Sequence, residues 1–409
     1  MTQLAQDTRR TTMAKAARMQ PNPHWAKLPL FDRKGWEKLP FGDIADCISE
    51  RADPKEEADA VYVGLEHLDP QDLHIRRWGK GSDVEGVKLR FYKGDIIFGR
   101  RRAYQRKLAV AEVDGICSAH AMVLRAKPGK CLPEFLPFLM MSDAFMQRAV
   151  EISVGSLSPT ISWKVLKLQE FSLPPLEQQR RMAELLWAVD EVVERYLVLE
   201  QSILTVVDSI RSAHFDGVLA DVPIQSIEDV GKWSTGNTPS RRIPEYWKGD
   251  FPWASPKDMK TALLEDTQEH LTASGKQQGV VVPPGTLMIV VRGMILAHSF
   301  PVCITGSEMA FNQDIKAFTP ESNLDVRYVY QWFKWMTPRI LGMTSTTSHG
   351  TKRLMMEDFG RLPFPLIPNA EQEAFLKRIH EVELLNEAWI QPINATDCSW
   401  GHAFKSSLG

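Results

Sequence analysis

Apolar residues recur at steps of three and four along the middle of the chain, which is the spacing of one face of an α-helix. The pattern predicts a helix from Leu176 to about Phe215, ended by Gly217. About 40 residues at a rise of about 1.5 Å each give a rod of roughly 60 Å. Its apolar seam consists of Met182, Leu186, Val189, Val193, Tyr196, Leu199, Ile203, Val206 and Ile210. A rod of this kind needs a partner for its seam, and the periodic segment from Asn369 to about Trp389 predicts an antiparallel helix pair.

The segments before these two helices follow the same order of elements, about 190 residues apart, which indicates an internal duplication. The matched segments are Phe41–Asp46 and Ile224–Asp229, Tyr62–Asp69 and Trp253–Asp258, Lys93–Arg100 and Pro284–Val291, Ser118–Leu124 and Asn312–Phe318, the amphipathic helices Glu134–Ala149 and Val326–Leu341, and the loops Gly155–Ser162 and Thr344–Arg353. Both copies end in a proline-led helix start, Leu173–Gln179 and Ile367–Glu373. The sequence therefore predicts an α+β chain in which two similar domains are joined by long antiparallel helices.

This order of elements divides the chain into six parts. They are an N-terminal tail over 1–35, a first domain over 36–173, a central helix over 174–220, a second domain over 221–367, a second helix over 368–392 and a C-terminal tail over 393–409. The start of the chain is mildly basic and lacks an apolar run, so we expect a disordered tail there.

Composition narrows the class of protein. The chain has 409 residues, of which 44% are hydrophobic and 24% charged, as in soluble globular proteins with two domains. A formal net charge of −2 excludes a surface that is basic throughout, so any contact with nucleic acid depends on local clusters. Five scattered cysteines without a C-x-x-C pair argue against a zinc site and fit a reduced cytoplasm. No apolar run of about 18 residues occurs, so we expect no membrane span.

The densest basic cluster follows a predicted strand and holds five cations in eight positions. Its members are Arg100, Arg101, Arg102, Tyr104, Gln105, Arg106 and Lys107. Cations neutralise phosphates, and the forked ends of arginine and glutamine can read base edges. The alternative is a solvated loop. We favour contact with DNA, because charge of this density repels itself without an anionic partner.

The second domain carries a comparable set of cations, hydroxyl groups and an amide. The candidates there are Thr235, Asn237, Thr238, Ser240, Arg241, Arg242, Lys248, Arg292, His349, Lys352 and Arg353, and the matching loop of the first domain adds Ser158 and Thr160. Hydroxyl and amide groups can meet phosphate oxygens. The loop that ends in Lys352 and Arg353 is equally consistent with a plain surface loop, and we expect Trp247 and Trp253 to be core anchors.

Motifs of catalysis are missing from the sequence. There is no Asn-Pro-Pro-aromatic motif of adenine methyltransferases, no Walker A, no G-x-G-x-x-G after a strand, no H-E-x-x-H and no G-x-S-x-G. Asp83, Glu85 and Lys88 have the wrong spacing for a nuclease, and Cys117 with His120 is only a weak indication of a nucleophile. We therefore expect no catalytic and no metal-binding residues.

Three features of the chain, spread over about residues 36–390, are together typical of one protein family. They are the internal repeat, the Thr235–Ser240 segment followed by Tyr246–Gly249, and the Leu173–Gln179 helix start. The chain resembles the specificity subunit of type I restriction-modification enzymes.

The resemblance implies that each domain is a target-recognition domain for one half of an interrupted double-stranded DNA site. It further implies that the helices are a spacer and a docking surface for two methyltransferase subunits. Those subunits would supply S-adenosylmethionine-dependent adenine methylation, and restriction/translocase subunits would use ATP and Mg²⁺, so we expect no cofactor in this chain. One departure is the second helix, which Pro392 and a polar tail cut short.

Two other classes of function stay open on the sequence alone. One is a stand-alone nuclease or modification enzyme with an unrecognised site, which the missing motifs weaken. The other is a duplicated scaffold for protein or carbohydrate, which the near-neutral charge and twelve tryptophans support and the basic loops weaken.

Overall fold

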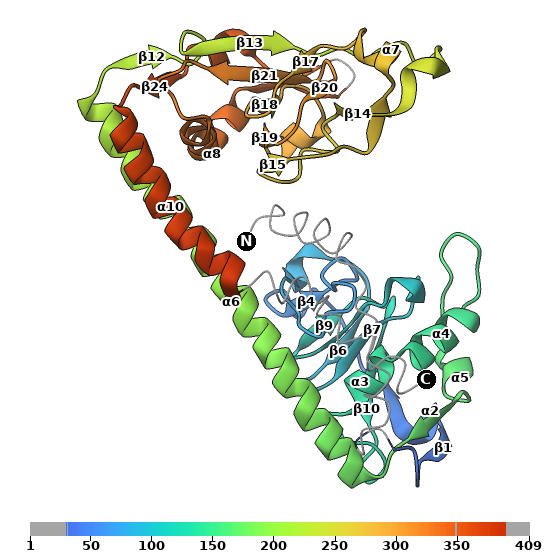
Figure 1. The fold of residues 1–409 in the computed structure, drawn as a ribbon. Coiled ribbons are helices and arrows are strands. Elements are labelled where there is room, and N and C mark those ends of the chain that lie inside the picture. Colours follow the sequence, from blue (N-terminus) through green and yellow to red (C-terminus); the bar gives the residue numbers. More distant parts are fainter. Residues whose placement is uncertain (1–29, 31, 348–349, 390–409) are drawn as a thin grey trace. The chain divides into compact units, whose positions relative to one another are not determined.

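The structure is a computed structural model that describes residues 30, 32–347 and 350–389 (Figure 1). Most of the predicted N-terminal tail, the C-terminal tail and His349 therefore lie outside the described residues. The chain forms two compact units, and the boundary between Tyr196 and Leu197 falls inside one continuous helix. We call the globular part before this helix head 1 and the globular part after it head 2.

Head 1 contains a four-stranded sheet in the order β2-β10-β7-β8 and a five-stranded sheet in the order β3-β6-β9-β4-β5. Its strands are β1 (Glu37–Pro40), β2 (Ala45–Ile48), β3 (Arg51–Ala52), β4 (Val61–Val63), β5 (Gly79–Lys80), β6 (Lys88–Phe91), β7 (Ile96–Gly99), β8 (Leu108–Val110), β9 (Gly115–Cys117), β10 (Ala121–Ala126) and β11 (Glu170–Leu173). Its helices are α2 (Phe41–Ile44), η3 (Gly81–Asp83), η4 (Ala103–Gln105), α3 (Leu136–Met141), α4 (Asp143–Glu151) and α5 (Trp163–Leu166).

The four-stranded sheet of head 1 is buried on both faces. Side chains alternate along a strand, so Ile96 and Phe98 of β7 pack with α3 and α4, whereas Ile97 packs toward the five-stranded sheet. This position explains why the segment is a continuous apolar run instead of an alternating one.

Head 2 repeats this arrangement, with sheets in the orders β13-β21-β18-β19-β15 and β16-β14-β20-β17. Its strands are β12 (Ile224–Ser226), β13 (Gly231–Thr235), β14 (Trp247–Ala254), β15 (Leu263–Leu264), β16 (Glu269–Leu271), β17 (Val281–Val282), β18 (Leu287–Val290), β19 (Val302–Thr305), β20 (Met309–Phe311), β21 (Ile315–Pro320), β22 (Thr344–Thr346), β23 (Lys352–Leu354) and β24 (Pro363–Pro365). Its helices are η5 (Pro244–Tyr246), α7 (Ala273–Lys276), η6 (Met294–Ala297), α8 (Val326–Gly342) and α9 (Met356–Gly360).

The strand pairing confirms the predicted duplication. Strands β4 and β9 pair in parallel through Tyr62 and Ile116, and β14 and β20 pair in parallel through Trp253 and Ala310. Tyr62 and Trp253 are therefore equivalent, as their alignment in the sequence predicts.

The first matched pair of segments is shifted by three residues. The Phe41 N–H donates to Gln169 in head 1, and the Ile227 N–H donates to Leu362 in head 2. Phe41 is therefore equivalent to Ile227 and not to Ile224, because the short strand β12 corresponds to β1 and precedes the turn.

The prediction of one continuous helix over Glu134–Ala149 is also wrong, because the chain forms two helices there, α3 and α4, which meet at Ser142. The Ser142 hydroxyl accepts from the Phe145 N–H (3.2 Å) and donates to the Leu139 carbonyl (2.6 Å). Serine at such a position caps a new helix, and the break turns the chain between two packed segments. Its counterpart α8 is continuous through Gly342.

Each long helix is fixed to its head by one buried glutamine in its first turn. The Gln179 amide donates to the carbonyl oxygens of Lys130 (3.0 Å) and Pro174 (2.8 Å) and accepts from the Leu132 N–H (2.9 Å). Gln372 makes the same three bonds in the second copy, with Asn323, Ile367 and Asp325. Because a buried amide with all these groups bonded tolerates little displacement, each helix start is held in register with its head.

The central helix α6 spans Leu176–Asp221 and has 46 residues, so the prediction that it ends at Gly217 is wrong. Gly217 is exposed inside the helix, where a glycine costs about 1 kcal/mol and does not stop it. Pro223 follows two residues after the end of the helix, where its missing N–H and ring oppose continuation.

In the second half of α6 the buried residues are not the ones that the predicted apolar seam contains. Val206 is 47% exposed, whereas Val207 is 3% and Phe215 0% exposed. A helix of 3.6 residues per turn drifts from a strict heptad, which moves the buried stripe by one position. Polar residues also take seam positions, because Asp190 and Arg211 are buried with bonded partners.

The first half of α6 is bound to head 1 by a cluster of charged residues. His74 lies 2.7 Å from Asp190 of α6 and 2.8 Å from Glu112, and Arg76 donates to Glu194 of α6 (2.9 Å). The hydrogen bond between His74 and Asp190 is the main reason that the pKa of His74 is raised to about 9. At neutral pH His74 is therefore a cation held between two carboxylates.

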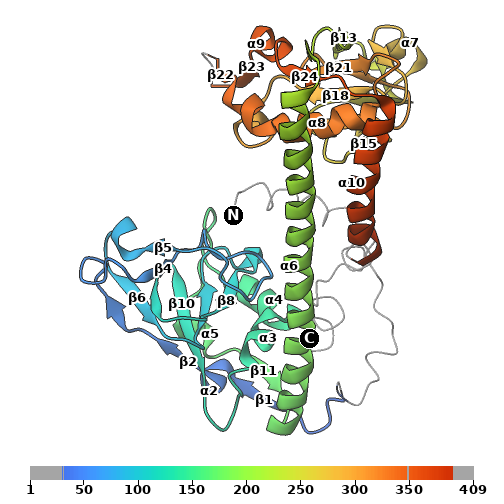
Figure 2. The same ribbon diagram turned by 90° about the vertical axis from the view of Figure 1, so that its left-hand side faces the viewer.

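The second half of α6 lies beside α10 (Asn369–Trp389), the second predicted helix (Figure 2). The His214 ring stacks on Phe375 with ring centroids 4.1 Å apart and lies 3.0 Å from the Tyr328 hydroxyl. Arg211, earlier in α6, lies within electrostatic range of Glu383, later in α10. The two helices are therefore antiparallel, as predicted.

Candidate nucleic-acid interface

In head 1 the structure brings two separately predicted segments together. Arg101, just after β7, forms a bridge with Thr160, and the Arg102 N–H donates to the Pro159 carbonyl (2.7 Å). The Arg101 Nε also donates to the Ser158 hydroxyl (3.2 Å). The basic cluster and the Gly155–Ser162 loop thus form one edge of head 1.

The five cations of the cluster divide into two groups. Arg106 forms an ion pair with Asp143, and the Lys107 ammonium donates to the Leu65 carbonyl (2.6 Å), so both serve the fold of the head. Arg100, Arg101 and Arg102 stand at the loop edge with no ion pair among the described residues. Arg102 adopts a left-handed conformation (φ 55°), which costs energy for a side-chain-bearing residue and is typical of functional loops.

The remaining candidates of this cluster and one further residue lie at the same edge. Tyr104 is 56% exposed and Gln105 is half-buried. His120 is exposed beside Arg100, which donates to the Ala119 carbonyl (3.0 Å). Burial and then the charges of Arg101 and Arg100 lower the pKa of His120, which indicates a positive potential at this edge. The sequence pointed to His120 only as a weak partner of Cys117 and not as a member of this edge, because Arg100 and Arg101 are about 20 positions away in the sequence.

Head 2 repeats this edge with Arg292, Lys352 and Arg353. Arg292 forms a bridge with Arg353, and the Gly293 N–H donates to the Lys352 carbonyl (3.0 Å). Arg292 is therefore equivalent to Arg101. Its side chain is about half exposed and lies 3.9 Å from Asp314. His349, the remaining candidate of this loop, lies outside the described residues.

The Ser234–Arg242 segment of head 2 is bound largely to its own head. Asn237 donates to the Gln278 carbonyl (2.6 Å) and accepts from the Val280 N–H (2.9 Å). The Thr238 hydroxyl donates to Gln313 (2.7 Å), which places this segment beside the loop that carries Asp314. Asn237 therefore holds this loop in place, and Thr238 lies toward the edge that carries Arg292.

The arginines and the other polar residues of this segment differ in their surroundings. Arg241 pairs with Glu269 (2.8 Å) and lies over the Trp247 ring at 3.7 Å. Arg242 and Lys248 are exposed. The Thr235 hydroxyl accepts from Lys316 (3.0 Å), and the Ser240 hydroxyl accepts from the Arg242 N–H (3.3 Å).

The two tryptophans of this part of head 2 anchor its smaller sheet. Trp253 is 3% exposed, and Trp247 is partly buried against it, with ring centroids 5.1 Å apart. Their expected role as core anchors is confirmed.

Two observations on the described residues bear on the sequence candidates for metal binding and catalysis. No group of three or more potential metal ligands occurs among these residues. Burial raises the pKa of Cys117 to about 12, so its thiol is protonated and is no nucleophile at neutral pH. Within the same residues no helix is both long and apolar enough to cross a membrane.

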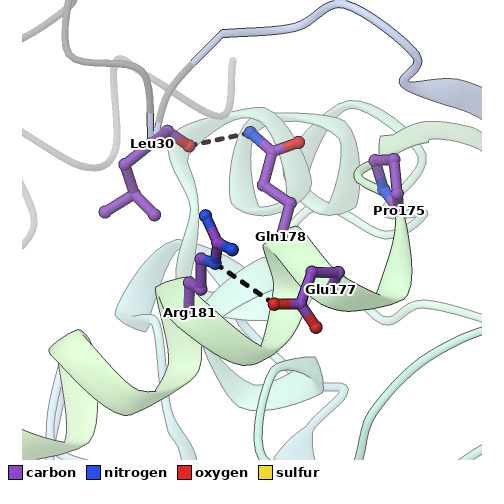
Figure 3. A pocket seen from close by; sticks show the side chains of 5 residues that line it. All are labelled: Leu30, Pro175, Glu177, Gln178 and Arg181. Carbon is purple, nitrogen blue, oxygen red and sulfur yellow. Dashed lines mark hydrogen bonds and ion pairs between the residues drawn. The ribbon is translucent and has the colours of Figure 1, made fainter.

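A surface hollow lies at the start of α6, between Leu30, Pro175, Glu177, Gln178 and Arg181 (Figure 3). The Gln178 amide donates to the Leu30 carbonyl (2.8 Å), and Arg181 pairs with Glu177 (3.2 Å). The two charged side chains that line it are thus paired with each other, and Gln178 connects Leu30 to the first turn of α6.

Comparison with known sequences identifies the family. The sequence model described as the type I restriction modification DNA specificity domain matches residues 33–197 and again 221–395. Each match covers one head and the helix segment after it, and together they span most of the chain. The chain belongs to this family and carries two copies of its domain.

Individual relatives agree with this assignment. The EcoR124I/EcoR124II specificity subunit of Escherichia coli is 28% identical over 165 residues, 40% of this chain and 40% of that protein. The EcoDI specificity subunit of Escherichia coli is 30% identical over 172 residues, 39% of this chain and 36% of that protein. The alignments thus span less than half the length of these relatives.

A solved structure supports the fold. The type I restriction-modification S subunit from M. genitalium is 14% identical, with a TM-score of 0.57, and the match covers 96% of this chain and 99% of that chain. The predicted α+β class, with two similar domains and long helices, is confirmed.

Proposed function

We propose that this chain is the DNA-reading, non-catalytic subunit of a type I restriction-modification system, and that each head reads one half of an interrupted site. The observation that carries the proposal is the repeated edge, where Arg101 meets Thr160 in head 1 and Arg292 meets Arg353 in head 2. Two cationic edges at equivalent positions of duplicated heads suit two separate contacts with one polyanion. The target-recognition domains would be residues 36–173 and 221–367.

The proposed DNA contacts fall into two groups. Arg100, Arg101, Arg102, Arg292 and Arg353 would bind phosphates or guanine edges, because their guanidinium groups stand at the loop edges. The other members of the interface are Tyr104, Gln105, Ser158, Thr160, Thr235, Thr238, Ser240, Arg242, Lys248, His349 and Lys352. Arg106, Lys107, Asn237 and Arg241 would support the loops through their bonds within each head.

The partners we propose are double-stranded DNA, two methyltransferase subunits and restriction/translocase subunits. The methyltransferase subunits would bind S-adenosylmethionine, the restriction subunits would bind ATP with Mg²⁺, and this chain would bind neither. The exposed apolar side chains of α6, among them Leu185, Val192 and Val198, suit docking of protein partners. The complex would act in the cytoplasm without a membrane, on chromosomal or incoming DNA.

Mapping of methylated adenines in cells with and without this chain tests the proposal. We expect a two-part motif that is methylated only when the chain is present, and its two halves should be separated by a constant gap. An identical methylation map in both strains would contradict the proposal. Cleavage of DNA by the purified chain alone would favour a stand-alone nuclease, a function that the family assignment does not favour.

A further inference from the structure

The loop between α4 and α5 of head 1 carries two of the most exposed apolar side chains among the described residues. Val154 is 79% exposed and Leu157 is 90% exposed. The loop extends from α4 and returns to α5 (Figure 1). A single exposed leucine is ordinary on a protein surface, so the position of this loop has to decide whether it has a role.

The loop is held in one conformation by its own hydrogen bonds. The Val154 N–H donates to the Thr160 carbonyl (3.1 Å), and the Thr160 N–H donates back to the Val154 carbonyl (3.0 Å). Gly155 at φ 118° allows the sharp turn that follows. Leu157 is therefore presented at the tip of a closed turn, so little conformational entropy is lost when it meets a partner.

The tip is also fixed to the cationic edge of the head. Arg101 donates to the Ser158 hydroxyl (3.2 Å), and the Arg102 N–H donates to the Pro159 carbonyl (2.7 Å). A ligand drawn to these arginines therefore meets Leu157, one residue before Ser158. Tyr104, 56% exposed, adds a second apolar surface in the same segment as Arg102.

We propose that Leu157 makes apolar contact with bases of the half-site read by head 1. This inference rests on the proposed function. The arginines fit phosphates, but a leucine gains nothing there, because phosphates are fully hydrated anions. The apolar surfaces of a duplex are the stacked base faces and the thymine methyl groups. Leu157 therefore contributes to sequence preference, whereas the charge of its arginine neighbours contributes affinity for DNA of any sequence.

The test uses the full chain in complex with its methyltransferase subunits and a pool of randomised duplexes. The wild-type protein selects a two-part motif. Leu157→Ala selects a motif that has lost preference at one or more positions of one half only, and it binds the wild-type motif about 10-fold more weakly. Affinity for unrelated DNA and its dependence on salt stay the same, because the arginines are untouched. Leu157→Met restores most of the preference.

The matched control is Leu168→Ala, which removes another exposed leucine of head 1 (68% exposed) away from this loop in the sequence. It should select the wild-type motif. Duplexes with uracil in place of thymine, or with 2-aminopurine at single positions, then show which base surface is used. A loss of affinity with uracil identifies a methyl contact, and a rise in 2-aminopurine fluorescence identifies an unstacked step.

Two results overturn the inference, and they are distinguishable. If Leu157→Ala selects the wild-type motif with unchanged affinity, the contact does not exist, although the proposed function stands. If the wild-type complex selects no two-part motif, the proposed function fails and the inference falls with it.

Discussion

Equivalent arginines of the two heads differ in how firmly they are held. Arg101 is fixed by its hydrogen bond to Ser158, whereas Arg292 has only a carboxylate 3.9 Å away. A side chain that is already oriented loses less entropy when it binds a phosphate. Head 1 therefore presents the better prepared contact, and head 2 has to displace the attraction of Asp314 first.

Removal of either arginine should weaken binding in a salt-dependent way. We expect Arg101→Ala and Arg292→Ala each to flatten the plot of log affinity against log salt concentration by about 0.9 units, because each loses about one phosphate contact. Titration of a duplex at several salt concentrations measures the slope. Arg148→Ala is the control, because Arg148 is an exposed arginine of α4 that pairs with Glu151. A slope that is unchanged in both variants would remove these arginines from the backbone contact.

Residue patterns predicted the edge of each head only in part. The density of charge at 100–107 pointed to the correct loop, and the pairing of Arg101 with Thr160 agrees with the order of the repeats. Local sequence could not separate Arg101 from Arg106, because the ion pair of Arg106 depends on Asp143, a residue 37 positions away. The same reason applies to Asn237, whose partners lie 41 and 43 positions further on.

The helices show a similar division between what periodicity predicts and what tertiary contacts decide. Steps of three and four correctly predicted both long helices and their antiparallel arrangement. They could not predict Asp190 and Arg211 on the buried side of α6, because apolar periodicity gives no weight to a polar residue with a partner in another segment. The sequence likewise predicted Gln179 and Gln372 only as residues of two helix starts. Their equivalent hydrogen bonds could not be predicted, because the partners lie in loops 47 positions away in the sequence.

Contact between α6 and α10 should depend on pH through His214. Burial, with a smaller effect of the Arg378 charge, lowers the pKa of His214 to about 4. The unfolded chain, with an ordinary histidine pKa near 6.5, therefore binds a proton that the folded chain does not. The contribution of His214 to stability should therefore be constant above about pH 6.5 and become unfavourable as the pH drops from there toward 4. After a discount for partial exposure the loss is about 1–2 kcal/mol.

Denaturant unfolding of the wild type and of His214→Phe across this pH range measures the effect. The phenylalanine keeps the stacking on Phe375 but cannot take up a proton, so the stability difference between the two proteins should change with pH. Other groups titrate equally in both proteins and cancel in the difference. A difference that stays constant from pH 7 to 4 would show that His214 is not the responsible group.

At the scale of the whole molecule, the boundary between the two compact units lies inside α6 and not in a flexible linker. In the proposed function this helix is the spacer between the two heads. We expect an insertion of four residues after Val198 to lengthen the preferred gap between the half-sites. Four residues add about 6 Å at about 1.5 Å each, slightly more than one turn, which corresponds to about two base pairs at about 3.4 Å each.

Selection of target sequences by the complex of the inserted variant measures this gap. The matched control replaces the exposed polar residues Gln201 and Ser202 by alanine, which changes the same part of α6 without changing the length of the helix. The control should keep the wild-type gap. If the inserted variant prefers the wild-type gap, the length of α6 does not set the distance between the half-sites.

The pairing of β1 with β11, and of β12 with β24, has a consequence for how such a protein can evolve. These ribbons bring the beginning and the end of each head to one place, next to the start of its long helix. A head is therefore an exchangeable cassette: recombination that replaces everything between two short strands leaves the junction intact. Exchange of one head would thus replace one half of the proposed recognition site in a single genetic event, while the other head and both long helices stay unchanged.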